Sequence, residues 1–473
     1  MNKQLILKKY VFLSLQFIFL CISVSIRVTY NWNSFIELSR FSTVYFAVSF
    51  LMIIIIQKRL LTAINIIYIL FILFQMGIPI AYSVNGEYMN GYVSLFNYSI
   101  LIKAILYSLV SIQLFTISLL LFINNRYDDR QLFYNKKKKY FNFEAINDSK
   151  YMFSLARLIY FISSIVVIPL YTYVAYLTLK QGFSQEIRSI VAANGLFNLA
   201  RAVYLPSFFL LLCYKSDNCH VIYAKSLFFY TSLCSLMSGN RTDGILWIIA
   251  YAFYSYQNNK HIDVKSKVKI FLVFVLLIIT SVFIAQKRMG NDSLFSINNI
   301  LSNVISEMGF NFTSICFVMM YLPVIHKSIA TSYFISIISL FPNSLDIFGI
   351  LHSIDNKLPI QLLWDLNHIK YNGLLDFGVG FSFIAESFYN FGNFGVILSP
   401  ILAWIITKLF DRSWRLSNGW NKYLQIITFY TLLTFPRRAF NEILSSIEYS
   451  IFVIFFIAIL FYKKNKSQKF LEK

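Results

Sequence analysis

Charged residues at the ends of apolar segments are the residues of this chain best placed to do chemistry. The first group is the turn SGNRTDG at residues 238–244, in which Arg241 starts the next apolar segment. Free N–H groups at a helix N-terminus favour an anion, and a guanidinium binds a diphosphate through paired hydrogen bonds. The turn therefore predicts an anion site. The alternative is an arginine that pairs with Asp243 or extends along an apolar surface to reach water.

The second candidate is Glu386, an isolated carboxylate in the apolar and aromatic segment FSFIAESFYNFG at residues 381–392. A charge in such surroundings is costly, so each one is a functional candidate. A carboxylate held there can act as general base toward a hydroxyl group. The alternative is a structural pair with a neighbouring arginine. Gly392 and Gly395 allow close backbone packing or a break in the helix.

The remaining cations are arginines near predicted loops. Adjacent arginines point in different directions on a helix, so we expect one of the pair at 437 and 438 to face a common cavity. For each of these arginines, a position at the membrane interface or a loop ion pair is an equal alternative. Together they predict a site for an anionic headgroup. The arginines of this group are Arg188, Arg201, Arg288, Arg437 and Arg438.

Several classes of enzyme leave no signature in this sequence. It has no GxGxxG, GxxxxGK[ST], GxSxG or HExxH motif. Its cysteines are odd in number and unpaired in spacing, and no His/Cys/carboxylate group has metal-ligand spacing. The sequence therefore predicts neither a metal nor a cofactor.

The composition is that of a membrane protein. Apolar residues make up 58% of the 473 residues and charged residues only 13%, whereas soluble chains have about 45–50% and 25%. About 20 apolar residues span a bilayer, and runs of this kind predict about fourteen transmembrane helices in an all-α polytopic bundle. The runs lie at 10–28, 41–56, 60–82, 99–123, 152–178, 202–214, 221–237, 244–257, 269–285, 308–325, 328–342, 381–410, 422–436 and 444–462. The run at 381–410 is long enough for a broken helix.

The net charge of +21 predicts the orientation. Cytoplasmic loops are rich in Lys and Arg. When the N-terminus is placed in the cytoplasm, two thirds of these residues fall on inner segments, and the outer segments are close to neutral. Both termini are then cytoplasmic. The Lys136–Lys139 run is better explained as a lipid-facing segment than as a nucleic-acid site.

We predict one transmembrane domain over residues 1–473. It carries a basic cytoplasmic loop at 124–150, an outer loop at 179–201 and a large outer loop at 343–380, which contains the outer histidines His352 and His368. A lone loop histidine is more often structural than catalytic.

With these features the chain resembles the Wzy-type O-antigen polymerases of bacterial surface-polysaccharide assembly. The segment SGNRTDGILW looks like the family's Gly-Ser-Arg turn, with Asn240 in place of the serine. The segment GVGFSFIAESFYNFGNFGVI is similar to the family's Glu-aromatic-Asn-Phe-Gly helix. Many spans and two notable outer loops complete a resemblance that covers nearly the whole length.

The resemblance implies a GT-C-like membrane glycosyltransferase of lipopolysaccharide biosynthesis, independent of metal. Two polyprenyl-diphosphate-linked oligosaccharides, a donor and an acceptor, would be joined at the outer face of the bacterial inner membrane. A chain-length regulator protein is a further implied partner, besides membrane lipid. Arg241 matches the family's turn arginine and Glu386 its helix glutamate. The five other arginines are assigned to the diphosphate by loop position alone.

Two alternatives stay open at this point. An O-antigen ligase carries a histidine followed by spaced glycines in its long outer loop; His352 is present, but the glycine spacing after it does not match well. A polysaccharide or lipid transporter (a flippase) would need charges deep in its helices. Most charges of this chain stand at outer helix ends, which favours a site at the interface.

Overall fold

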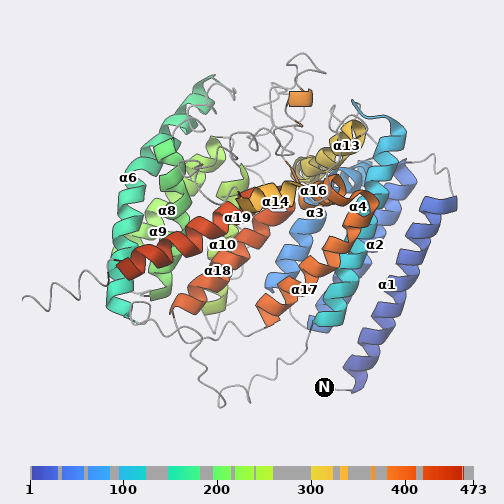
Figure 1. Ribbon diagram of the computed structural model, residues 1–473, viewed down its shortest axis with the longest axis horizontal. Coiled ribbons are helices and arrows are strands. Elements are labelled where there is room, and N and C mark those ends of the chain that lie inside the picture. Colours follow the sequence, from blue (N-terminus) through green and yellow to red (C-terminus); the bar gives the residue numbers. More distant parts are fainter. Residues whose placement is uncertain are drawn as a thin grey trace, which may run out of the picture. The chain divides into compact units, whose positions relative to one another are not determined.

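The computed structural model describes the helical parts of the chain (Figure 1). The residues described are 3–29, 35–57, 62–85, 95–123, 148–181, 195–214, 219–238, 241–258, 300–322, 331–338, 363, 365–367, 381–411, 419–460 and 462. All secondary structure within these ranges is helical. The prediction of an all-α protein is therefore confirmed for this part of the chain.

The described residues form two compact units. The first unit takes its residues from Met1–Asn135, Phe295–Arg412 and Leu432–Leu444, and the second from the remaining segments. The chain thus passes from one unit to the other several times. The prediction of one transmembrane domain is not tested by this division and stays a prediction.

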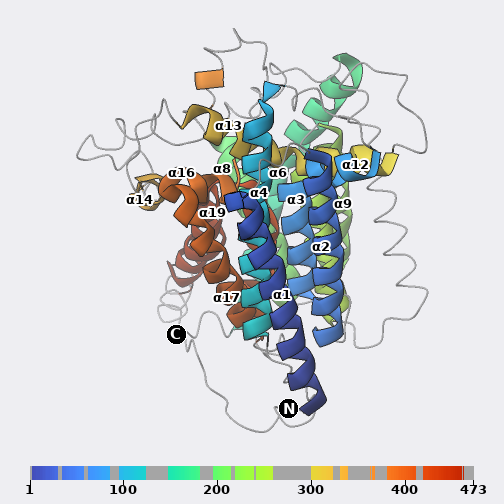
Figure 2. The ribbon, with the colours of Figure 1, turned by 90° about the vertical axis from the view of Figure 1, so that its right-hand side faces the viewer.

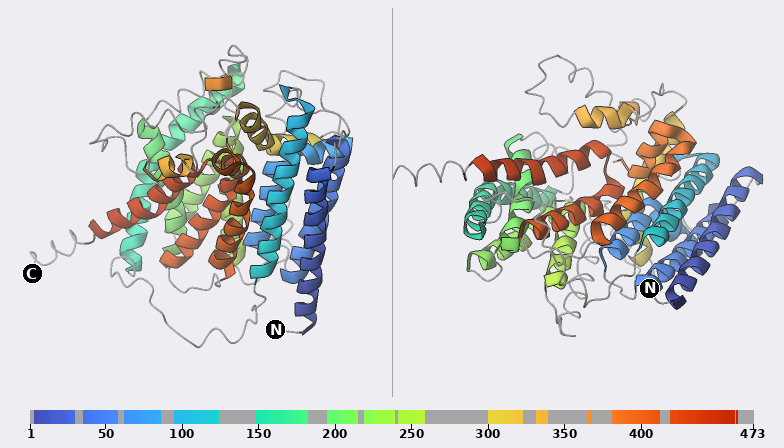
Figure 3. Two further views of the ribbon diagram at one scale, coloured as in Figure 1. Left: turned by 45° about the vertical axis from the view of Figure 1, so that its right-hand side comes forward. Right: turned by 60° about the horizontal axis from the view of Figure 1, so that its bottom comes forward.

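The first unit is built around a buried central helix, α4 (Tyr98–Phe122). Helices α1 (Lys3–Thr29), α2 (Phe35–Gln57) and α17 (Leu398–Asp411) pack against it, and Figures 2 and 3 show these helices side by side. Apolar side chains almost all round α4 explain its burial, because such a helix is stable only inside a bundle or a bilayer.

Helix α3 (Ala63–Asn85) completes this packing and meets a second group of short helices. A Cβ at Gly77 would overlap the Ile305 carbonyl oxygen and the Gly309 backbone. Only small residues allow two helix backbones to come this close. The short helices of the group are α12 (Ile300–Met308), η4 (Gly309–Asn311), α13 (Phe312–Tyr321) and α14 (Thr331–Ile338).

The second unit is held together by aromatic side chains and hydroxyl groups. Its helices are α6 (Ser149–Gln181), α8 (Gly195–Tyr214), α9 (Cys219–Met237), α10 (Arg241–Asn258), most of α18 (Gly419–Thr434) and the π-helical η9 (Glu448–Val453). The Phe208 and Phe228 rings stack at 4.2 Å between centroids. The Tyr160 hydroxyl donates to the Ala224 carbonyl at 2.9 Å, so its polar group is satisfied inside the apolar interior.

The predicted spans are recovered in part. Eight helices of the described part are long and apolar enough to cross a membrane, and Gly309–Tyr321 is a shorter apolar helix. The prediction of about fourteen spans and a GT-C-like arrangement is not confirmed. The run at 269–285 lies outside the described residues, and only α14 is described in the run at 328–342.

The long apolar run at 381–410 forms an interrupted helix, as its length allowed. Helix α16 (Phe383–Phe391) ends where Gly392 adopts a φ of 57°, and the 3₁₀ segment η7 (Gly392–Ile397) then leads into α17. A φ in this range favours glycine because other residues clash there. The break places α16 as a separate short helix, and this helix carries Glu386.

Candidate functional site

The site in the first unit is built on α16, whose start is fixed by a side-chain cap. The Ser382 hydroxyl accepts a hydrogen bond from the Ala385 N–H at 3.2 Å, which satisfies one of the free N–H groups of the first turn. The Ser314 hydroxyl of α13 donates to the same oxygen at 3.1 Å. The cap therefore also ties α16 to α13.

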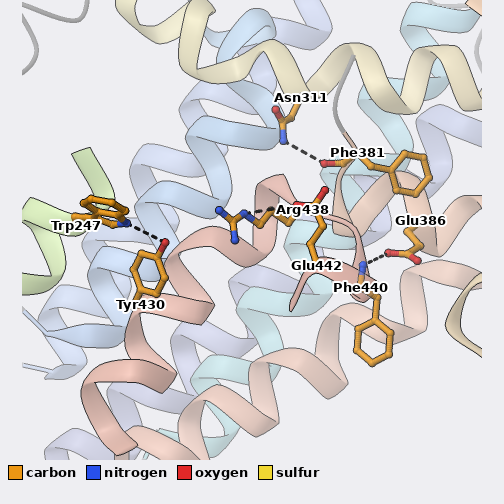
Figure 4. A network of polar contacts seen from close by, with 8 residues as sticks. All are labelled: Trp247, Asn311, Phe381, Glu386, Tyr430, Arg438, Phe440 and Glu442. Carbon is orange, nitrogen blue, oxygen red and sulfur yellow. Dashed lines mark hydrogen bonds and ion pairs between the residues drawn. The ribbon is translucent and has the colours of Figure 1, made fainter. Parts of the chain in front are cut away.

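The Glu386 carboxylate is buried, with 2% of the residue exposed, and both of its oxygens accept a hydrogen bond. The Ser332 hydroxyl of α14 donates to Oε1 at 2.8 Å. The backbone N–H of Phe440 donates to Oε2 at 2.7 Å (Figure 4). Among the described residues, both donors to this carboxylate are neutral. The predicted alternative of a pair with an arginine therefore does not occur in the described part.

Asn390 stands four residues after Glu386, on the same face of α16, and joins the network. Its Nδ2 donates to the Ser332 hydroxyl at 2.7 Å and to the Glu386 carbonyl at 2.8 Å. Its Oδ1 accepts from the Ser332 N–H at 3.1 Å. Every polar atom of the Asn390 amide thus has a partner, and Ser332 fixes α14 to α16 through both its backbone N–H and its hydroxyl.

Tyr333 covers the network with an aromatic ring. It stacks on Phe391, with 6.0 Å between ring centroids, and meets Phe440 edge-on at 5.2 Å. Its hydroxyl lies 3.5 Å from the Ser387 hydroxyl of α16. Tyr333 is therefore a second residue of α14 that contacts α16.

The 3₁₀ turn η8 (Phe435–Arg437) leads into α19 (Phe440–Ile447) and carries two arginines. The Arg437 guanidinium lies 5.8 Å from the centre of the Phe74 ring, within the range of a cation–π contact. The Arg438 Nε lies 3.6 Å from a Glu442 carboxylate oxygen (Figure 4). The two side chains thus contact different partners, and the prediction that one of them faces a common cavity stays a prediction.

The Arg438–Glu442 pair is partly open to solvent, with 21% and 40% of the two side chains exposed. Exposed pairs of this kind hold their charges only weakly. Arg438 and Glu442 thus form a partly exposed ion pair next to the buried polar network of Glu386.

Comparison with protein families decides the assignment. The family model described as O-antigen polysaccharide polymerase Wzy matches residues 10–469. The chain belongs to this family. Comparison with curated proteins and with solved structures gave no match. Family membership confirms the resemblance seen in the motifs, and it gives the chain its general activity, the polymerisation of O-antigen polysaccharide.

As a member of the Wzy family with eight candidate spans in its described part, the chain is a multi-pass membrane protein and an enzyme. The described residues contain no group of three or more His, Cys, Asp or Glu side chains that could hold a metal ion. In the first unit of this Wzy protein, the charged groups next to the Glu386 network are Arg438 and its partner Glu442.

The structure places the predicted arginines in both units. Arg437 and Arg438 belong to the first unit together with Glu386. Arg241 begins α10 in the second unit, as its position in the turn predicted, and Arg201 lies half-buried in α8 of the same unit. The other two predicted arginines, Arg188 and Arg288, lie outside the described residues.

Helices α9 and α10 pack closely where α10 begins with Arg241, and Gly244 allows this packing. A Cβ at Gly244 would lie 2.7 Å from a Leu236 side-chain carbon and 2.8 Å from the Ser232 carbonyl oxygen. Glycine therefore lets α10 begin directly against α9. This close packing fixes where the helix that starts with Arg241 can run.

The sequence did not reveal three members of the network. Ser332 and Asn390 are neutral, and so is Gln75, whose Nε2 donates a hydrogen bond to the Pro436 carbonyl beside the two arginines. Each lies in an apolar segment that reads as a membrane span. Asn390 carried two usable signals, its i, i+4 spacing from Glu386 and its place in the family's Glu-aromatic-Asn-Phe-Gly helix. The other two residues come from distant parts of the chain, so only the fold shows that they meet this site.

Proposed function

We propose that this protein joins polyprenyl-diphosphate-linked oligosaccharide repeat units at the outer face of the bacterial inner membrane, with both of its termini in the cytoplasm. The observation that carries the proposal is the arginine turn beside the buried Glu386 network, in a chain of the Wzy family. Membrane lipid surrounds the protein, and a chain-length regulator protein is the further partner that the family resemblance implies.

The reaction follows from the chemistry of these substrates. A hydroxyl of the distal sugar of one unit attacks the anomeric carbon of the other unit's first sugar. The new glycosidic C–O bond forms as the bond to the diphosphate oxygen breaks, and polyprenyl diphosphate leaves. Negative charge grows on the diphosphate in the transition state, and positively charged groups placed beside it lower the barrier.

Arginines suit the diphosphate because the planar guanidinium donates paired hydrogen bonds to phosphate oxygens. We assign this role to Arg437 and Arg438, which lie at the end of η8 and directly after it. Arg241 keeps its role as a prediction from its match to the family's turn arginine, and Arg188, Arg201 and Arg288 keep theirs as predictions from their loop positions. Guanidinium groups can neutralise the leaving group alone, so the proposed reaction is independent of metal.

The attacking hydroxyl must lose a proton. The sequence predicts Glu386 as the general base, and this role stays a prediction. A base must take the proton at an oxygen with a free lone pair. Both oxygens of Glu386 already accept hydrogen bonds, from Ser332 and from the Phe440 N–H, so the base would have to use a remaining lone pair inside a closed network.

The experiment is reconstitution in liposomes with lipid-linked repeat units, with and without EDTA. The proposal predicts a ladder of glycans that grow on the lipid carrier in both cases. Product confined to a single transfer onto lipid A would indicate an O-antigen ligase. Movement of intact lipid-linked units across the bilayer without growth would indicate a transporter.

A further inference from the structure

The turn that carries Arg437 and Arg438 is held at both of its ends by side chains from other helices. On one side, Nε2 of Gln75 on α3 donates a hydrogen bond to the Pro436 carbonyl. On the other side, the Glu386 carboxylate of α16 accepts from the Phe440 N–H at 2.7 Å. Only the two arginines and Ala439 lie between these anchor points.

The Glu386 anchor meets a backbone group that has no partner within its own helix. Phe440 is the first residue of α19, and the N–H groups of a first helical turn have no partner within the helix. A carboxylate at a helix N-terminus satisfies such a group and is favoured by the helix dipole. Glu386 thus acts as a cap supplied by a helix 54 residues away.

The side chain of Gln75 lowers the stability of the fold at its buried position. The residue is fully buried in the apolar helix α3, and its Oε1 has no hydrogen-bond partner within the described part of the chain. A buried polar atom without a partner destabilises a fold. The amide has one use among the described contacts, the hydrogen bond to the turn, so its cost indicates a role in fixing that turn.

We propose that Gln75 and Glu386 are positioning residues that clamp the arginine turn from both sides. The clamp itself rests only on these two contacts. Its effect on catalysis rests on the proposed function, because a fixed turn holds the guanidinium groups in place before the diphosphate arrives. Pre-organised charge costs no rearrangement during the reaction.

The clamp gives Glu386 a role that differs from that of a general base. A glutamine at this position keeps an oxygen for the Phe440 N–H, and the Ser332 hydroxyl can rotate to accept from its amide. The Phe440 N–H therefore keeps its acceptor in Glu386→Gln and loses it in Glu386→Ala. A general base fails in both variants, because an amide takes up no proton.

Gln113 of α4 offers a matched control. Like Gln75 it is fully buried in a membrane helix, and its Oε1 also lacks a partner in the described part. Its Nε2 donates to the Ser23 hydroxyl of α1 at 2.7 Å, so it fixes α1 and does not reach the turn. Gln113→Met and Gln75→Met both replace a buried amide by an apolar chain of similar length.

The test measures backbone hydrogen exchange over residues 437–444 together with the polymerisation rate, in the full-length protein. We expect faster hydrogen exchange in Gln75→Met and Glu386→Ala, together with a polymerisation rate at least about 10-fold lower than that of the wild type. Gln113→Met should show wild-type exchange. Glu386→Gln should keep wild-type exchange, because its amide oxygen still accepts from the Phe440 N–H. Exchange in this variant therefore reports positioning, and its polymerisation rate reports the proton transfer predicted for Glu386.

Unchanged exchange in both Gln75→Met and Glu386→Ala would overturn the clamp. Exchange in Glu386→Gln as fast as in Glu386→Ala would overturn the positioning role of Glu386. Faster exchange with an undiminished rate would leave the clamp in place and remove the two arginines from the diphosphate site, which is a failure of the proposed function. Gln75→Met also removes Oε1, the buried oxygen that has no partner in the described part. Faster exchange in this variant therefore reports the lost contact to the turn and not a destabilised fold.

Discussion

The carboxylate of Glu386 accepts a hydrogen bond from the backbone N–H of Phe440 at 2.7 Å, although the two residues are 54 positions apart. This contact joins the conspicuous acidic residue of α16 to the turn that carries Arg437 and Arg438. The two motifs that the sequence presents separately are thus neighbours in the first unit. The contact makes the position of the arginines depend on α16.

The arginine turn should lose diphosphate binding when its second arginine is removed. We expect Arg438→Ala to lower kcat/KM for lipid-linked repeat units by about 10- to 100-fold, because a hydrogen-bonded charge contributes about 1.5–3 kcal/mol. The kcat/KM of Arg438→Lys should lie between the values of Arg438→Ala and the wild type, because lysine keeps the charge but lacks the planar guanidinium. Steady-state kinetics with purified protein measure this.

Glu442→Gln is the matched control for this series. It removes the partner of Arg438 and leaves the arginine in place. An exposed pair contributes little, so we expect a change in kcat/KM below about threefold. An equal loss in Glu442→Gln and Arg438→Ala would show that the ion pair, and not the cation, supports activity.

Arg241 should be essential although it belongs to the other unit. We expect Arg241→Ala to abolish chain extension while the protein is still expressed in the membrane, because the guanidinium is lost at the start of α10. Glycan length on gels and immunoblots of the membrane fraction measure both properties. Full chain extension in this variant would show that polymerisation does not require Arg241.

Asn390 should be sensitive to the kind of substitution. Asn390→Ala loses donors to Ser332 and to the Glu386 carbonyl, which should lower the free energy of unfolding by about 1–3 kcal/mol. Asn390→Asp places a second carboxylate beside Glu386 and replaces hydrogen-bond donors by acceptors. It should therefore lower the free energy of unfolding by at least about 3 kcal/mol. Thermal unfolding in detergent measures both. An aspartate variant as stable as the alanine variant would contradict the network.

Gly77 should not tolerate a side chain. Its Cβ would overlap backbone atoms of Ile305 and Gly309, which cannot rotate away, so we expect Gly77→Ala to destabilise the protein by about 1–3 kcal/mol. At Gly195, the first residue of α8, a Cβ would meet no heavy atom of the described residues within 4 Å. Gly195→Ala should therefore leave thermal stability unchanged or slightly raised. Equal effects of the two substitutions would contradict the close helix contact.

Much of the fold could be predicted from the sequence because apolar runs of about 20 residues have few structures open to them in a bilayer. The run at 99–123 became α4 at Tyr98–Phe122, and the run at 381–410 broke where Gly392 takes a positive φ. Hydropathy does not show every helix. The run at 308–325 corresponds to η4 and α13, whereas the short helix α12 before it, at Ile300–Met308, was not predicted.

The candidate site was predictable only in its charged members. Glu386 and Arg438 stand out because a charge next to hydrocarbon is costly. Gln75 and Ser332 do not stand out, since neutral polar residues are frequent in membrane helices. Their contacts join α3 to Pro436 and α14 to α16, and contacts between distant segments follow from packing that no local pattern shows.

The central claim is that this protein lengthens glycans on a lipid carrier and that the clamped arginine turn takes part. The most direct measurement is the length distribution of lipid-linked glycans made by wild-type and Arg438→Ala protein in liposomes given the same amount of repeat unit. The account predicts a ladder for the wild type and, for Arg438→Ala, unreacted units with a short, faint ladder. Identical ladders from the two proteins, or no product longer than one unit from the wild type, would contradict it.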